Sequence, residues 1–207
     1  MHRSLLLLRH GRTAWNVEGR GQGQTDVPLD QVGREQARAA GAAVAAFRPA
    51  AVWSSDSSRA YDTAVCIGQP VQADARLREI ALGTYEGRTM SDWEQDDPET
   101  FHRWRAGYDV QRGGGECYSD VAARVVPALQ DAWGGMSDPT GLLVVVSHGG
   151  AIRALLTAVL ELPPAPWARL AALGNCCCAL LADSEDGRGL RLITYGVPPQ
   201  ALPRPGD

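Results

Sequence analysis

The sequence predicts an α/β protein, a three-layer α/β/α sandwich whose central, mostly parallel sheet has helices on both faces. Short apolar runs alternate along the chain with segments of helical periodicity. Two of these runs end in a histidine followed by glycine, at 10–11 and 148–149. The 207 residues are 44% hydrophobic and 21% charged, which suits one globular domain spanning residues 1–207.

The first part of the chain supplies three strands and two helices. Strands are expected at 4–8, 51–54 and 70–73, and helices at 31–47 and 58–68. Asp30 is a suitable N-cap for the first helix, and Pro49 stops it. The polar residues 55–58 that follow the second strand are a suitable beginning for the second helix.

The segment 83–116 interrupts this alternation. It is rich in Trp, Asp, Glu and Arg, contains a helix expected at 91–105, and ends near the glycine triplet 113–115. Trp93 and Trp104 are compatible with one face of that helix, where they would form a small core. We expect this segment to be an insertion that serves as a lid and carries substrate specificity.

The remaining part returns to the alternating pattern. Helices are expected at 117–133 and 150–160, and strands at 142–147, 176–182 and 190–195. Prolines at 163, 164 and 166 prevent the stretch 154–182 from forming one helix. The proline-rich end, 198–207, is expected to be a loose tail.

Composition excludes several classes of function. The chain contains no lysine, so P-loop, Schiff-base and pyridoxal-phosphate chemistry are excluded, and a bound phosphate must be held by arginine, histidine or backbone N–H groups. The net charge of −4 does not favour nucleic acid, and no apolar stretch is long enough to span a membrane. The odd number of cysteines, three of them adjacent at 176–178, argues against disulfides and a metal site and favours the cytoplasm.

Charged side chains follow strand ends or begin helices at four places. Arg9 and His10 follow the first strand, Arg59 lies on a first helical turn, Glu79 follows the third strand, and His148 follows the fourth. Because ligands of open α/β sheets bind outside the carboxyl ends of the strands, we expect these side chains to meet in one site.

These residue types suit transfer of a phosphoryl group. Arg9 and Arg59 can bind its oxygens bidentately, and a protonated His148 would add a third positive donor. A neutral His10 can attack phosphorus through one ring nitrogen while a backbone carbonyl fixes the other. Glu79 can protonate the leaving alcohol.

Eight motifs in order, from residue 4 to about residue 182, resemble the histidine phosphatase superfamily, the phosphoglycerate-mutase-like group. They are LRHGRTAWN (8–16), GRGQG (19–23), DVPL (26–29), RAYDTA (59–64), REI (78–80), YEG (85–87), GGE (114–116) and HGG (148–150). Arg12 and Cys117 depart from the family pattern, which commonly has an acidic residue or glutamine and a serine at these places.

The resemblance implies a role for each matching residue. His10 would be the phosphorylated nucleophile and Glu79 the proton donor, with Arg9, Arg59 and His148 completing the catalytic phosphate pocket. The substrate-binding positions would be Asn16, Gln22, Gly23 and Gly149. It implies neither a metal nor an organic cofactor, a small-molecule phosphomonoester as the partner, and a chain that can form a homodimer.

Three functions remain open at this stage. The motif LGTYEG (82–87) and the short, acidic insertion resemble the phosphatase branch, and features such as residues 162–163 and 174–175 are most like glucosyl-3-phosphoglycerate phosphatases. The favoured function is therefore hydrolysis of a small sugar phosphate or phosphoglycerate through phosphohistidine. The alternatives are a cofactor-dependent phosphoglycerate mutase and a catalytically silent phosphate-binding module.

Overall fold

Alternation of side chains along β1 (Ser4–Arg9) sets the layers of the molecule. Leu5 and Leu7 belong to one apolar core, whereas Leu6 and Leu8 belong to another, and all four are fully buried. Because successive side chains of a strand point to opposite faces, a strand buried on both faces must lie in the middle layer. The four leucines thus place β1 in the middle layer of the predicted α/β/α sandwich, with one apolar core on each face of the sheet.

The structure is a computed structural model that describes residues 3–138, 140–162, 170–184 and 189–202. Its other strands are β2 (Ala51–Ser54), β3 (Val71–Ala73), β4 (Leu142–Ser147), β5 (Cys178–Asp183) and β6 (Leu190–Val197), and the order in the sheet is β3-β2-β4-β1-β5-β6. Strands β3, β2, β4 and β1 pair in parallel, and β5 is antiparallel to both of its neighbours. The predicted α/β fold with a mostly parallel sheet is confirmed.

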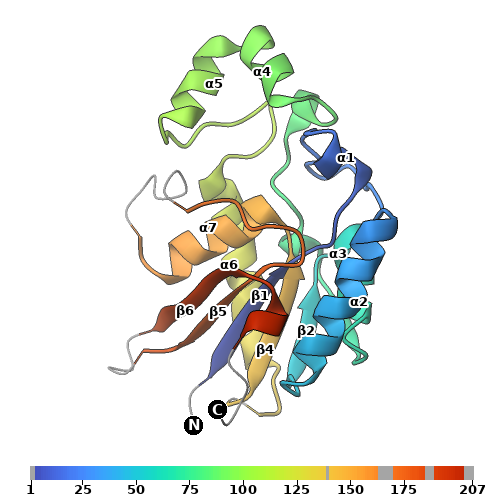
Figure 1. Cartoon of the computed structure of the whole chain (residues 1–207). Helices are drawn as coiled ribbons and strands as arrows, with labels where there is room; N and C mark the ends of the chain where they lie inside the picture. Colours follow the sequence, from blue (N-terminus) through green and yellow to red (C-terminus); the bar gives the residue numbers. More distant parts are fainter. Residues whose placement is uncertain (1–2, 139, 163–169, 185–188, 203–207) are drawn as a thin grey trace.

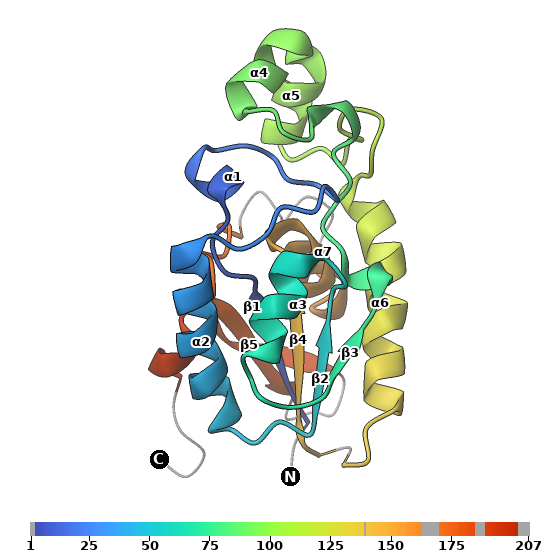
Figure 2. The ribbon, with the colours of Figure 1, turned by 90° about the vertical axis from the view of Figure 1, so that its right-hand side faces the viewer.

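Helices cover both faces of this sheet (Figure 2). On one face lie α2 (Gln31–Ala45) and α3 (Ser58–Val65), and on the other α6 (Tyr118–Gly134) and α7 (Gly149–Val159). Asp30 caps α2 as predicted, because its Oδ1 accepts the Gly33 N–H at 2.6 Å. The short α1 (Ala14–Val17) lies in the loop after β1.

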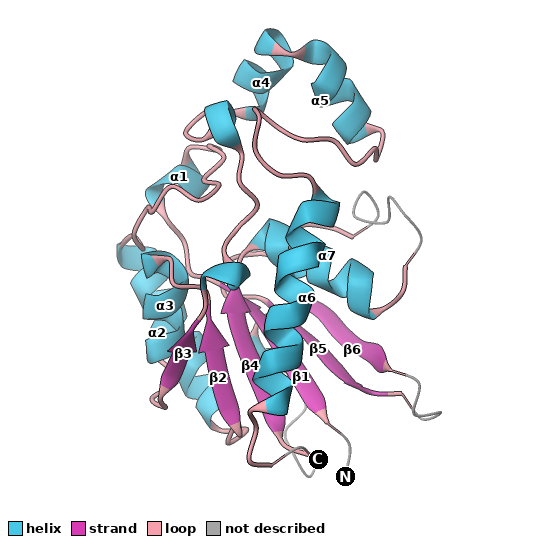
Figure 3. Cartoon of the chain, turned by 180° about the vertical axis from the view of Figure 1, so that it is seen from behind, coloured by secondary structure: helices cyan, strands magenta, loops and turns pink. Residues whose placement is uncertain are grey.

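The segment 83–116 leaves the sheet and carries α4 (Met90–Asp96) and α5 (Pro98–Arg105) beyond the carboxyl ends of the strands (Figures 1 and 3). The single helix expected at 91–105 is wrong, since Asp97 leaves helical geometry and caps α5 through the Thr100 N–H. Trp93 and Trp104 nevertheless form a small core, with ring centroids 5.1 Å apart.

Two boundaries near the carboxyl end also differ from expectation. Strand β5 begins at Cys178, because Cys176 has a φ of 52° and its N–H donates to the carbonyl oxygens of Arg9 and His10. The tail is not loose as far as residue 202: Pro199–Ala201 form a 3-10 turn, and Pro199 and Leu202 are buried. Residues 203–207 and the prolines at 163, 164 and 166 lie outside the described residues.

Candidate active site

His10 lies at the point where β1 ends beside β4. Its backbone N–H donates to the Ser147 carbonyl at 3.0 Å, and its side chain is 2% exposed. The Nδ1 atom lies 2.7 Å from the Gly11 carbonyl oxygen, so Nδ1 carries the proton and Nε2 is left as the nucleophilic atom. Burial, reinforced by Arg9 and Arg59, holds the pKa of His10 well below its usual range, which keeps the ring neutral.

Two arginines lie beside this ring. Arg59, on the first turn of α3, is fully buried, and its Nη1 and Nη2 donate to the Thr25 and Gly23 carbonyls at 2.9 Å. Arg9 donates through Nη1 to the Leu173 carbonyl. The Nε atoms of both arginines are buried without a hydrogen-bond partner among the described residues. Burial lowers the pKa of both guanidinium groups. A bound anion would supply the hydrogen-bond acceptors and the negative charge that they lack.

His148 is the N-cap residue of α7, and its ring centroid lies 5.1 Å from that of His10. Its Nε2 is 2.9 Å from the Ser55 hydroxyl, while Nδ1 has no partner in the described part of the chain. Burial first, and then the nearby Arg59, His10 and Arg9, hold its pKa well below the usual range. In the ligand-free protein His148 is therefore neutral and donates through one N–H, whereas the sequence analysis considered a protonated ring.

Glu79 reaches this edge of the sheet from the loop after β3 and caps α7. Its Oε1 accepts the N–H groups of Ile80 and Ala151 at 2.8 and 2.9 Å, and its Oε2 accepts the Gly150 N–H at 3.0 Å. Carboxylates at helix N-termini are stabilised by the unpaired N–H groups there. The geometry leaves Oε2, which accepts a single N–H, as the oxygen able to exchange a proton.

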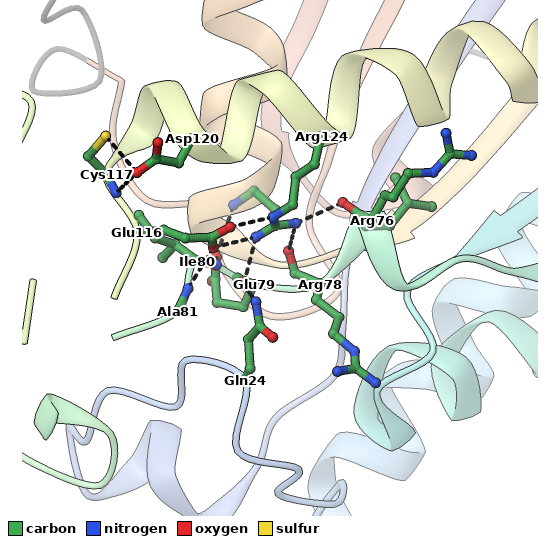
Figure 4. Close-up of polar contacts among 12 residues, drawn as sticks. Gln24, Arg76, Arg78, Glu79, Ile80, Ala81, Glu116, Cys117, Asp120 and Arg124 are labelled. Atoms are coloured by element: carbon green, nitrogen blue, oxygen red, sulfur yellow. Dashed lines mark hydrogen bonds and ion pairs between the residues drawn. The ribbon is translucent and has the colours of Figure 1, made fainter. Parts of the chain in front are cut away.

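The loop that carries Glu79 is held from behind by Arg124 on α6 (Figure 4). Arg124 donates to the carbonyl oxygens of Arg76, Arg78 and Glu79 at 2.7 to 2.9 Å. Its Nε and Nη2 also bind the carboxylate of Glu116 at 2.7 and 2.8 Å. One guanidinium thus fixes the backbone that positions the Glu79 carboxyl.

The predicted residues meet around one cavity of about 220 Å³. It is lined by seven of the nine predicted site residues, namely Arg9, His10, Asn16, Gln22, Gly23, Glu79 and Gly149. The other two, Arg59 and His148, are fully buried and contact Gly23 and His10 of the cavity wall, respectively. Gly23 contributes its carbonyl to Arg59, and the Gln22 Oε1 accepts the Thr13 hydroxyl at 3.0 Å.

The two departures from the family pattern lie outside this cavity. Arg12 forms an ion pair with Asp30 at 2.8 Å, so it braces the beginning of α2. Cys117 is the N-cap residue of α6, and its N–H donates to Asp120 Oδ2 at 2.9 Å (Figure 4). Neither position contributes a lining side chain.

Three further arginines line the cavity, Arg20, Arg112 and Arg153, and the predicted site included none of them. Arg112, which the sequence pattern did not single out, is 6% exposed and lines the cavity. Arg153 on α7, which carried no assigned role, lines it too and donates through Nη1 to the Tyr118 hydroxyl at 3.1 Å. The available signal was the spacing of Arg153 four residues after Gly149, which places it one helical turn from the site.

No group of three or more metal-ligating side chains occurs within the described residues. All five cysteines are free thiols. Among the helices that the structure describes, none has the length and apolarity needed to cross a bilayer.

Curated relatives include both phosphatases and phosphoglycerate mutases. The chain is 43% identical over 183 residues to a glucosyl-3-phosphoglycerate phosphatase of Mycobacterium tuberculosis, covering 84% of this chain and 82% of that one. It is 33% identical to a metal-independent phosphoserine phosphatase of Arabidopsis thaliana, covering 73% and 66%. It is 34% identical to a probable phosphoglycerate mutase of Salmonella paratyphi C, covering 87% and 85%.

Solved structures and family membership agree with these relatives. A mycobacterial glucosyl-3-phosphoglycerate phosphatase complexed with VO3 superposes with a TM-score of 0.87 at 39% identity, over 94% of this chain and 99% of that one. Residues 5–195 match the histidine phosphatase superfamily, branch 1. With the match spanning every strand that borders the cavity, this chain belongs to branch 1 of the histidine phosphatase superfamily.

Proposed function

We propose that this protein hydrolyses phosphomonoesters of small phosphorylated metabolites through a phosphohistidine formed on His10. The observation that carries the proposal is the hydrogen bond from His10 Nδ1 to the Gly11 carbonyl, which leaves Nε2 as a neutral nucleophile beside two buried guanidinium groups. The relatives named as phosphatases support the same reaction class.

The first step forms a phosphorus–nitrogen bond and breaks the ester bond. Nε2 of His10 attacks phosphorus as the ester oxygen leaves, and that oxygen takes a proton from Glu79 Oε2. Arg9, Arg59 and His148 bind the three non-bridging oxygens, whose charge must be stabilised in the transition state. Their unpartnered donors, Nε of the arginines and Nδ1 of His148, are already in place.

The second step regenerates the enzyme with water. The Glu79 carboxylate removes a proton from water, the water oxygen attacks phosphorus, and the bond to Nε2 breaks to give orthophosphate and neutral His10. Each proton that Glu79 gives up in the first step is recovered in the second. The chain's own side chains therefore suffice for this cycle, and we expect chelators such as EDTA to leave the rate unchanged.

The substrate that we propose is a phosphoglycerate or a sugar derivative of it. The cavity of about 220 Å³ suits a small metabolite. A relative that is 43% identical over 84% of this chain is named for glucosyl-3-phosphoglycerate. A mutase of this family carries a longer, basic insertion, whereas the insertion of this chain is short and has acidic residues at 94, 96, 97 and 99. Mutase activity is therefore disfavoured.

Release of phosphate from a panel of phosphoglycerates, sugar phosphates and p-nitrophenyl phosphate tests the reaction. We expect turnover by the wild type, none by folded His10→Ala, and an acid-labile phosphoenzyme after rapid quenching of the wild type. Near-normal turnover by His10→Ala would overturn the assignment of the nucleophile. Phosphate exchange between 3- and 2-phosphoglycerate without release would identify a mutase, and tight phosphate binding without turnover would identify a silent binding module.

A further inference from the structure

The cavity wall also contains two arginines that are not among the phosphoryl-binding residues. Arg112 comes from the loop that follows α5, Arg153 from α7, and both line the same cavity as His10 and Glu79. The mechanism proposed above uses neither of them. Both guanidinium groups reach the Tyr118 hydroxyl, to which Arg153 Nη1 lies at 3.1 Å.

Arg112 is buried, and among the described residues no carboxylate forms an ion pair with its guanidinium. It is 6% exposed, and its Nε and Nη2 atoms have no hydrogen-bond partner among the described residues. Its guanidinium carbon lies 5.3 Å from the centre of the Tyr118 ring and 5.8 Å from that of Trp104. A buried guanidinium is costly unless it is paired, so the position indicates a ligand that supplies the missing acceptors.

The loop that carries Arg112 is fixed relative to Glu79. The Gly113 carbonyl accepts the Thr84 N–H, and the Glu116 N–H donates to the Ala81 carbonyl, both at 2.9 Å. At Gly113, which has a φ of 57°, a Cβ would lie 2.4 Å from the Leu82 carbonyl oxygen. These two chain segments therefore pack backbone to backbone, and Arg112 is held at a set place in the cavity wall.

Arg153 is held equally well by its helix. It lies one turn after Gly149 and Gly150, at the end of α7 that binds the Glu79 carboxylate. Its Nε is also buried without a partner within the described part of the chain. Arg20, a further arginine of the cavity, is different, because Glu18 pairs with it at 2.6 Å.

Charge decides what the second group can bind. Arg9, Arg112 and Arg153 line the cavity, and Arg59 contacts Gly23 of its wall. None of the four has an ion pair within 4.0 Å among the described residues. Glu79 is the one carboxylate in the described cavity wall. A phosphomonoester carries about two negative charges, and Glu79 is protonated when it acts as the acid, which leaves an excess of about two positive charges. A substrate carboxylate offsets part of that charge, and its planar oxygens match guanidinium geometry.

We propose that Arg112 and Arg153, together with the Tyr118 hydroxyl, form a second subsite that binds a carboxylate of the substrate. This inference rests on the proposed function and narrows it. The preferred substrates are phosphomonoesters that carry a carboxylate a few bonds from the phosphate, as in phosphoglycerates. The phosphoryl end performs the reaction, and the second subsite selects what is attached to it.

A pair of substrates that differ only at the carboxylate tests the subsite. In 3-phosphoglycerate a carboxylate stands where glycerol 3-phosphate has a hydroxymethyl group. We expect the wild type to prefer 3-phosphoglycerate in kcat/KM. Arg153→Gln and Arg112→Gln should each lower kcat/KM for 3-phosphoglycerate by about 10- to 100-fold, as expected for loss of a charge-assisted bond. Glycerol 3-phosphate should change by less than about 3-fold, because it makes no such bond.

Controls separate this subsite from general damage. Arg103→Gln removes an exposed arginine of α5 and should leave both substrates unaffected. If the buried Arg112 variant fails to fold, Arg153→Gln and Arg153→Lys carry the test. An equal loss with both substrates, or no preference in the wild type, would overturn the subsite. A preference of the wild type for 1,3-propanediol bisphosphate that Arg112→Gln abolishes would assign it to a second phosphate instead.

The same assays separate the two proposals. Hydrolysis of p-nitrophenyl phosphate without discrimination for the carboxylate would leave the phosphatase proposal standing and end that of the subsite. Absence of phosphate release from every substrate would end the phosphatase proposal itself.

Discussion

Glycine is required at position 150 by the contact between α7 and Glu79. A Cβ there would lie 2.5 Å from Glu79 Oε1 and 3.0 Å from Ile80 Cγ2. The carboxyl would have to move, whereas the helix itself would tolerate alanine well. We therefore expect Gly150→Ala to lower kcat by about 10- to 100-fold, the scale of a misplacement near 1 Å, with little change in Tm.

Gly134→Ala is the matched control for that substitution. At Gly134, the last residue of α6, nothing lies within 4 Å of an added Cβ. Gly134→Ala should keep a normal kcat and be about 0.4–1 kcal/mol more stable, because alanine lowers the conformational entropy of the unfolded chain. Steady-state kinetics and thermal unfolding of both variants check the pair. Full activity in Gly150→Ala would show that the placement of Glu79 is not critical.

Among single residues, local pattern identified those that end a strand or begin a helix, and the family resemblance added Asn16, Gln22 and Gly23. His10 and His148 could be placed because each follows an apolar run directly. Arg112 could not, because its burial depends on Trp104 and Tyr118, whose rings approach it only after the chain folds back. Local pattern carries no information on such contacts, so nothing in the glycine-rich loop singled out this arginine.

Helix α6 contributes to the reaction through a single side chain. Arg124 binds three backbone carbonyls of the segment before and at Glu79 and also the Glu116 carboxylate. Lysine lacks the planar fork that makes these contacts together. We expect Arg124→Lys to lower kcat by about 10- to 100-fold, with a smaller change in KM, and to cost about 2–4 kcal/mol of stability.

Arg76→Gln separates this role from the general effect of removing an arginine nearby. The Arg76 side chain is 40% exposed and pairs with Asp74 and Asp131, while its backbone carbonyl alone accepts from Arg124. Its kcat should stay within about 3-fold of the wild type, since the bond to Arg124 is retained. Equal losses of kcat in the two variants would show that Arg124 does not act by positioning Glu79.

The two helices of the insertion depend on one aromatic cluster. Trp93 is 3% exposed and packs against Phe101 and Trp104, with centroids 5.2 and 5.1 Å away. Trp93→Ala should destabilise this pair of helices by about 3–5 kcal/mol. Helices of seven and eight residues are not stable without such packing, so both should unfold locally. Hydrogen exchange should therefore rise across residues 90–105 while the sheet stays protected.

Tyr108→Ala provides the control for the insertion, because Tyr108 is 60% exposed. It should leave exchange in α4 and α5 close to that of the wild type. Faster exchange throughout the sheet in Trp93→Ala would mean that the insertion and the sheet unfold together. In Trp93→Ala the activity should fall more for 3-phosphoglycerate than for p-nitrophenyl phosphate, since Arg112 follows the two helices of the insertion in the chain.

For the molecule as a whole, the fold was predictable because the signal is local and repeated. Alternating apolar runs and helical periodicity gave all six strands within a few residues. The break at Asp97 had a local signal that the prediction of one helix overlooked: Pro98 follows it, and the residue before a proline is disfavoured in the helical conformation. The packed turn at 199–201 was missed because Leu202 is buried against α2, which no local pattern records. Contacts between distant segments therefore account for the second error, whereas the first was readable from the adjacent proline.

Burial of two neutral histidines makes the stability of the whole molecule depend on pH. The pKa values of His10 and His148 are held well below the usual range, chiefly by burial and then by neighbouring arginines. Below about pH 6.5 the unfolded chain takes up protons at these positions and the folded chain does not. Stability is therefore fully present above that pH and is lost as pH falls, by up to about 1.4 kcal/mol per pH unit for each histidine.

Urea unfolding at pH 7.5, 6.0 and 5.0 at constant ionic strength measures this dependence. Against the wild type, His148→Asn should show a shallower loss of stability between pH 6.0 and 5.0, because one of the two proton uptakes is gone. His102→Asn, which removes an exposed histidine on α5, should retain the slope of the wild type. Carboxyls with lowered pKa values, such as Asp56 and Asp74, titrate at lower pH and contribute alike in all three proteins. Identical slopes in the wild type and His148→Asn would show that His148 is protonated in the folded protein and that the phosphate pocket is charged before any substrate arrives.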